Sequence, residues 1–176
     1  MIANNTKPLV GVSSCLLGNK VRYDGQEKTN QLIVETMSQY LEFVAICPEV
    51  GIGLGVPRPP IQLVGDPSSP RAVGIENNDI DVTDKLISYA EEILGTHPEL
   101  CGFIFKSRSP SCGVHDTPVL TNSSEDLTMG AGLFVQAIRY IRPDLPVEDE
   151  VHLQRQTPRT HFIQKVSPYY NKKPSP

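Results

Sequence analysis

The segment CGFIFKSRSPSCG, residues 101–113, is an apolar run that leads directly into a turn carrying a thiol. Its first part predicts a short buried strand, and the Ser, Pro and Gly residues around Cys112 predict a tight turn. A cysteine that only fills a core needs no such turn, so Cys112 is a candidate for ligation or reaction. Cys101 has no turn beside it and is interpreted as core packing.

Two other cysteines follow short apolar runs in the same way. Cys15 ends LVGVSSC, residues 9–15, and Cys47 ends FVAIC, residues 43–47, just before a proline. Cysteines that follow strands of a parallel sheet meet at its carboxyl edge, where ligands bind in such folds. The three thiols are therefore expected to converge. The competing interpretation is three unrelated buried thiols at strand ends.

Apolar spacing between these runs predicts the remaining elements. Amphipathic helices are expected over residues 27–41, 82–94 (ending at Gly95) and 129–141, a last strand over 145–149, and a hairpin over 61–76 as an edge feature. Residues 114–128 suggest a polar, mobile segment. The alternation predicts an α/β fold: a mostly parallel sheet with helices on both faces, a Rossmann-like three-layer arrangement. We expect one domain over residues 1–150 and a partly disordered C-terminal extension over 151–176, with a short helix near Phe162 and disorder over 171–176.

Composition narrows the class of function. A net charge of −4 over 176 residues disfavours binding of long nucleic acid through phosphates, although a single nucleotide or base needs little charge. No apolar stretch is long enough to span a membrane, and the N-terminus lacks a secretory signal. We expect a cytoplasmic protein, in which cysteines ligate or react more often than they form disulfides.

Several chemistries suit three converging thiols. The close cysteine pairs typical of zinc sites and ferredoxin clusters are absent from the sequence. An iron–sulfur cluster held from three loops is compatible with the spacing and would leave one iron open to substrate. A cysteine hydrolase is another possibility, with His115 as the base for Cys112. A non-catalytic metal- or sulfur-binding module, or a redox sensor, is the third.

Three sequence blocks together resemble one known family. They are VSSCLLG with VRYDG (residues 12–25), CPEVGIGLGVPRPPIQL (47–63) and KSRSPSCG (106–113). They look like the signature blocks of the thiouracil and thiouridine desulfidases, long catalogued as a domain of unknown function. The resemblance implies an enzyme that removes sulfur from a thiolated uracil or thiouridine without net electron transfer and releases sulfide. It also implies a 4Fe–4S cluster, whose open iron captures the sulfur and which an aerobically purified sample can lack.

Transferred to this chain, the resemblance assigns roles to individual residues. It implies cluster ligation by Cys15, Cys47 and Cys112, and acid–base chemistry by Glu49. Ser109 and Ser111 are candidate catalytic residues, of which one contacts substrate or water and the other holds the turn. Substrate-binding candidates are Arg22, Tyr23, Asp24 and Arg58; the alternatives are a turn held by Asp24 and a salt bridge made by Arg58.

The chain departs from the family pattern at two places. Gln62 stands where members commonly carry an acidic residue, which is expected to alter proton handling or substrate range. Residues 145–170 resemble the junction to a second domain that longer members carry. The expected partner is a small thiolated pyrimidine or its nucleotide.

Overall fold

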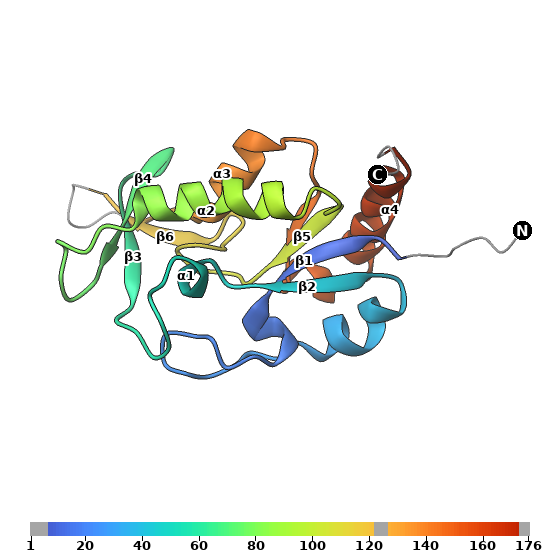
Figure 1. Ribbon diagram of the computed structural model, residues 1–176, viewed down its shortest axis with the longest axis horizontal. Helices are drawn as coiled ribbons and strands as arrows, with labels where there is room; N and C mark the ends of the chain where they lie inside the picture. Colours follow the sequence, from blue (N-terminus) through green and yellow to red (C-terminus); the bar gives the residue numbers. More distant parts are fainter. Residues whose placement is uncertain (1–6, 122–126, 173–176) are drawn as a thin grey trace, which may run out of the picture.

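A four-stranded, all-parallel sheet forms the centre of the computed structural model, which describes residues 7–121 and 127–172 (Figure 1). Its strand order is β2-β1-β5-β8. Parallel pairing joins β1 to β2 and β5, and β5 to β8, so the carboxyl ends of all four strands lie at one edge. These strands are β1 (Leu9–Ser13), β2 (Glu42–Ile46), β5 (Gly102–Phe105) and β8 (Val147–Asp149).

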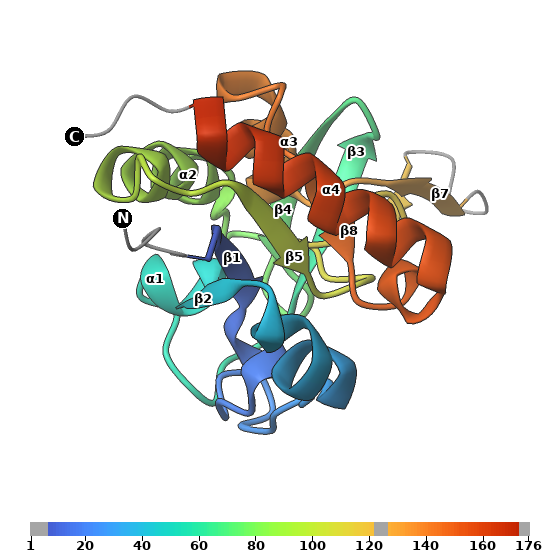
Figure 2. The same cartoon turned by 90° about the vertical axis from the view of Figure 1, so that its right-hand side faces the viewer.

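Helices cover both faces of this sheet. In β5, Phe103 and Phe105 pack with helices α2 (Thr83–Thr96) and α3 (Leu133–Ile141), while Ile104 faces the opposite core. That second core holds the helical turns η2 (Leu32–Thr36) and η3 (Met37–Gln39) and helix α4 (Gln156–Lys172). Figure 2 views the layers from the side. The predicted α/β fold with its three layers is confirmed, because period-two alternation gives each strand two apolar faces.

A second sheet, of order β4-β3-β6-β7, was not predicted. The hairpin over residues 61–76 is present, but it forms part of this sheet and has its own core, in which Leu63 and Val119 are fully buried. The expectation of a polar, mobile segment over 114–128 is wrong where β6 and β7 form, because Val119 pairs with Leu63 of β3. Residues 122–126 lie outside the described part of the chain. The strands are β3 (Ile61–Asp66), β4 (Ser69–Gly74), β6 (Thr117–Leu120) and β7 (Leu127–Gly130).

Two of the three predicted helices begin later than expected. The backbone N–H groups of Lys28 and Asn30 donate to the carbonyls of Cys15 and Leu16, each at 2.9 Å, so residues 27–30 follow the first cysteine turn instead of forming a helix. Residues 129–130 belong to β7, and α3 starts at Leu133. Helix α2 continues through Gly95 by one residue, within the usual uncertainty of helix ends.

The predicted C-terminal helix is present and longer than expected. Helix α4 spans 17 residues, and its Phe162 and Val166 are buried in the core that also contains Cys15 and Val10. The expected disorder over 171–176 falls largely on residues 173–176, which lie outside the described part. No helix within residues 7–121 and 127–172 is long and apolar enough to cross a membrane.

Candidate metal centre

Three strand ends bring Cys15, Cys47 and Cys112 to one cavity of about 510 Å³. Cys15 lies in the turn η1 (Ser14–Leu17) directly after β1, and Cys47 lies between β2 and the one-turn helix α1 (Pro48–Gly51). Cys112 lies in the loop after β5. The convergence predicted from the sequence is therefore present, because neighbouring parallel strands β2, β1 and β5 end at the same edge.

The turn that carries Cys112 is held by hydrogen bonds to Ser109. Ser109 Oγ accepts hydrogen bonds from the backbone N–H groups of Ser111 at 3.3 Å and of Cys112 at 3.1 Å. Gly132, before α3, packs so closely on this turn that a Cβ there would lie 2.4 Å from the Ser111 carbonyl oxygen. The turn is thus fixed both from within and from α3.

Burial controls the acidity of these thiols. It raises the pKa of Cys15 to about 11 and also raises the pKa of Cys47. The pKa of Cys112 lies well above its ordinary value, chiefly through burial, with the neighbouring Cys47 adding to the rise. A nucleophilic cysteine needs the opposite shift, toward the thiolate at neutral pH. Metal binding at this site therefore has to displace protons from the thiols.

The donor set fits a cluster better than a single ion. Among the described residues, no three His, Cys, Asp or Glu side chains are grouped to hold one metal ion. Each cysteine of a 4Fe–4S cluster binds a different iron, so its ligands need not share one ion. Three thiols around one cavity, mutually close enough to influence one another's pKa, satisfy this weaker requirement.

A carboxylate held by two buried groups lies in the same cavity. Arg58 Nε donates to Glu49 Oε2 at 2.8 Å, and Ser111 Oγ donates to Glu49 Oε1 at 2.9 Å. The Arg58 guanidinium also donates to the carbonyls of Val21 at 2.8 Å and Gly55 at 2.9 Å. The salt-bridge alternative for Arg58 is therefore what the geometry shows, although Arg58 also lines the cavity.

The two serines have different positions. Ser109 lines the cavity, and because its oxygen accepts two N–H groups, its own proton is left to donate elsewhere. Ser111 is fully buried, does not line the cavity and donates to Glu49. Ser109 is thus the one of the pair that is placed to meet a ligand.

Of the remaining predicted residues, some line the cavity and others do not. Arg22 and Tyr23 line the cavity, with the guanidinium 5.8 Å from the ring centroid. Asp24 does not; its carboxylate accepts the Gln26 N–H at 3.0 Å and so holds the turn. His115 also lies outside the lining and faces Asp149 and His152. Cys101 is fully buried in the core, as expected.

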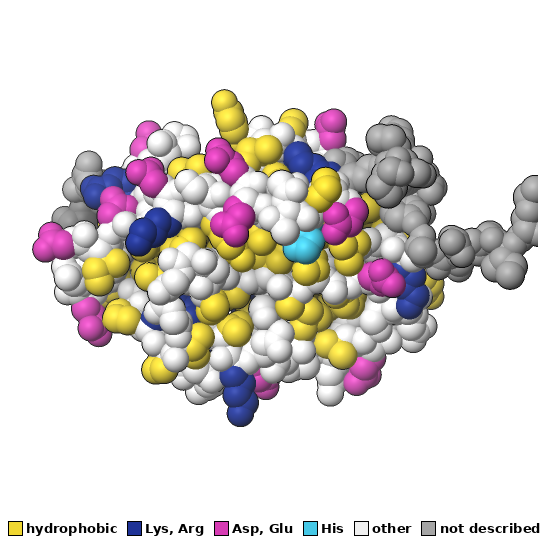
Figure 3. All heavy atoms as spheres, in the orientation of Figure 1, with side chains coloured by type: hydrophobic (Ala, Val, Ile, Leu, Met, Phe, Trp, Pro, Cys, Tyr) yellow, Lys and Arg dark blue, Asp and Glu magenta, His cyan; other side chains and the backbone are white. Residues whose placement is uncertain are grey.

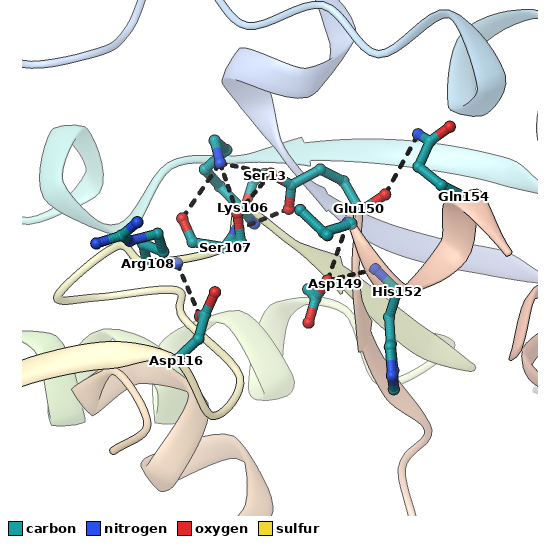
Figure 4. A network of polar contacts seen from close by, with 10 residues as sticks. Ser13, Lys106, Ser107, Arg108, Asp116, Asp149, Glu150, His152 and Gln154 are labelled. Carbon is teal, nitrogen blue, oxygen red and sulfur yellow. Dashed lines mark hydrogen bonds and ion pairs between the residues drawn. The ribbon is translucent and has the colours of Figure 1, made fainter. Parts of the chain in front are cut away.

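Sequence reasoning missed a buried network under the cavity (Figure 4). Lys106 pairs with Glu150 and donates to Ser107 Oγ at 2.8 Å, and the Lys106 N–H donates to Ser13 Oγ at 2.9 Å. Ser13, Lys106 and Ser107 line the cavity, and the Ser13 side chain lowers the pKa of the Cys112 thiol against the larger effect of burial. The block KSRSPSCG contained two of these residues, but nothing in it indicated Glu150 as their partner.

Charged side chains of both signs are scattered over the surface drawn in Figure 3, around hydrophobic side chains that gather across its middle. On that face, the described residues form no dense basic patch of the kind that binds a nucleic-acid backbone.

A parallel sheet whose carboxyl edge presents three thiols and one carboxylate to a single cavity has the layout of a thiol-ligated metalloenzyme. A family model described as 2-thiouracil desulfurase matches residues 10–150, and this chain belongs to that family. Its members are desulfidases, so the family resemblance of the sequence blocks is confirmed.

Two known proteins are similar to this chain. The solved structure of a 4Fe–4S-dependent thiouracil desulfidase, TudS, matches with a TM-score of 0.64 and 30% identity, covering 88% of this chain and 99% of that one. The uncharacterized protein YbbK of Bacillus subtilis (strain 168) is 31% identical over 116 residues, which are 60% of this chain and 73% of that protein.

Proposed function

We propose that this protein desulfurises a thiolated uracil or thiouridine to the oxygen form and releases sulfide, with a 4Fe–4S cluster held by Cys15, Cys47 and Cys112. The observation that carries the proposal is the meeting of these three thiols with Glu49 in one cavity. Family membership supports the substrate class, and the similar solved structure is cluster-dependent. The reaction exchanges a C=S for a C=O group with water as the oxygen donor, so no electrons are gained or lost.

Glu49 is the proton carrier in this proposal. Arg58 and Ser111 each hold one of its carboxylate oxygens, and the side chain remains in contact with the cavity. A carboxylate fixed in this way can take a proton from the attacking water and return it to the departing sulfur or the ring. Ser109 donates its free proton to the substrate or the water. When bound, the cluster supplies a Lewis-acidic iron that accepts sulfur.

The cavity also offers groups that can orient a planar base. Arg22 and the adjacent Tyr23 ring line the cavity, as does Lys106, which pairs with Glu150. Positioning of the reacting carbon near both the water and Glu49 is expected to contribute much of the rate. Gln62 belongs to β3 and is not part of the cavity lining, so an effect of this substitution on the reaction would have to be indirect.

The test is anaerobic reconstitution with iron and sulfide, followed by turnover of 2-thiouracil, 4-thiouracil and 4-thiouridine monophosphate in parallel. We expect a brown protein that consumes at least one substrate with stoichiometric sulfide, and no turnover by Glu49→Gln, which should retain iron. Iron uptake without turnover of any of the three substrates would favour the non-catalytic module instead.

A cysteine hydrolase would behave differently. It requires activity without iron and loss of activity in His115→Ala. We expect neither, because the pKa of Cys112 is raised by burial and His115 faces Asp149.

A further inference from the structure

Among the described residues, Arg108 is the one non-glycine residue with a positive φ, at 60°. This region of backbone space is costly for a side chain with a Cβ, and Gly, Asn or Asp occupies it at lower cost. Strain of this kind persists where the surroundings impose it, and it gathers at functional sites. An arginine at this position therefore calls for a reason other than stability of the turn.

The surroundings fix the backbone of Arg108 and leave its side chain free. The Asp116 carboxylate accepts a hydrogen bond from the Arg108 backbone N–H at 2.9 Å, so it binds the main chain of Arg108 and not its guanidinium. In Figure 4 the guanidinium extends away from this contact and from the Lys106–Glu150 network. Arg108 is an exposed residue that lines the cavity, immediately before Ser109.

The lack of a side-chain partner distinguishes Arg108 from the other two arginines that line the cavity. The guanidinium of Arg58 is bound by Glu49 and two carbonyls, and Arg22 is 3.8 Å from Asp24. Within the described residues, the Arg108 guanidinium has no hydrogen-bond or ion-pair partner among the contacts observed. Its donors are therefore available to a ligand.

We propose that Arg108 is a substrate-contacting residue whose guanidinium donates hydrogen bonds to an acceptor oxygen of the thiolated pyrimidine. This inference rests on the proposed function and extends it to the recognition of the substrate. The acceptor is either the ring carbonyl that remains beside the thiocarbonyl or the phosphate of a nucleotide. A guanidinium recognises both through the same donors.

The test compares Arg108→Ala and Arg108→Gly with the wild type in reconstituted protein. Dissociation constants are measured by equilibrium dialysis, and kcat/KM is measured wherever sulfide is released. We expect both variants to lose about 10- to 100-fold in affinity for the ligand that carries the contacted oxygen, the loss that follows removal of a charged donor. That ligand is 2-thiouracil if the oxygen is the ring carbonyl, and 4-thiouridine monophosphate if it is the phosphate. Arg155→Ala, which removes an exposed arginine outside the cavity, should leave the affinity unchanged.

Matched ligands identify the oxygen. Pyrimidine-2-thione lacks the carbonyl, so a loss below about twofold for this ligand, together with the full loss for 2-thiouracil, assigns the contact to the carbonyl. A larger loss for 4-thiouridine monophosphate than for 4-thiouracil assigns it to the phosphate. Thermal unfolding is the second readout: Arg108→Gly should have a midpoint no lower than the wild type, because glycine relieves the strain at φ 60°.

Unchanged affinity of both variants for all four ligands would overturn the proposal, as would absence of binding by the wild type. A thermal midpoint for Arg108→Gly several degrees below that of the wild type would also overturn the proposal, because the arginine would then stabilise the fold. If the wild type binds 2-thiouracil but releases no sulfide, and Arg108→Ala binds it more weakly, then the contact is supported and the proposed reaction is not.

Discussion

Replacing Arg58 by Met should destabilise the protein by about 3 kcal/mol, because it removes one partner of a buried ion pair and leaves the other charge uncompensated. The side chains of Arg58 and Glu49 are 4% and 12% exposed, and their atoms Nε and Oε2 lie 2.8 Å apart. The substitution also removes the donors to the Val21 and Gly55 carbonyls. For a chain of this size, such a loss lowers the thermal midpoint by about 6–12 °C.

A second substitution separates charge from packing. In the double variant Glu49→Gln with Arg58→Met, no charge is left unpaired, so we expect the stability to recover by about 1–2 kcal/mol relative to Arg58→Met alone. The desulfurising activity should not recover, because the amide cannot carry the proton.

The assay is urea unfolding followed by circular dichroism, with Arg71→Met as the control. Arg71 pairs with Asp81 at 2.6 Å, but its side chain is 62% exposed, and exposed pairs contribute at most about 1 kcal/mol. Equal losses for Arg58→Met and Arg71→Met, or a double variant no more stable than Arg58→Met, would refute the claim that Arg58 neutralises a buried carboxylate.

Three further predictions concern the cysteines and their support. Cys112→Ser should abolish iron retention after reconstitution, whereas Cys101→Ala should retain iron, as measured by iron content; loss of iron in both would contradict the assignment. For cluster-free protein, the raised pKa of Cys15, about 11, means that between about pH 9 and 11 its thiol ionises only in the unfolded chain. Cys15 should therefore lower the free energy of unfolding by up to about 1.4 kcal/mol per pH unit, to which the raised pKa values of Cys47 and Cys112 add, and the fall should be smaller in Cys15→Ser. A flat profile from pH 8 to 10.5 would oppose this. Gly132→Ala places a Cβ 2.4 Å from the Ser111 carbonyl oxygen, so it should cost about 1–3 kcal/mol and weaken iron retention; an unchanged variant would show that the turn of Cys112 yields easily.

The sequence predicted the central sheet well because its strands are short apolar runs that end in recognisable turns. The shared edge of Cys15, Cys47 and Cys112 followed from topology, since strands of a parallel sheet end on the same side. The second sheet was missed because its strands β6 and β7 have four residues each and lie in polar sequence. Strand β6 pairs with β3, more than 50 residues away, and β7 pairs with β6 in turn; local patterns do not report such long-range pairing.

The site was also predicted only in part, because the partners of its charged residues depend on the fold. Glu49 and Ser109 line the cavity as expected. Arg58 and Glu49 are nine residues apart, and whether they pair depends on the path of the loop between them, while Lys106 pairs with Glu150 from 44 residues away. A charged residue in a sequence block indicates that a charge is present, and only the fold determines its partner. The strain at Arg108 likewise has no sequence signal, because arginine is an ordinary residue in most turns.

The spacing of the three thiols along the chain has a consequence for biogenesis. Their positions, 15, 47 and 112, are separated by whole structural elements, and the last turn is closed by Gly132. Short metal-binding modules gather their ligands within a few residues and can fold around the ion. In the proposed function, a chain that ends before residue 132 would lack the contact that closes the third turn, so a cluster would bind to a nearly complete fold and would not direct the folding of one short segment.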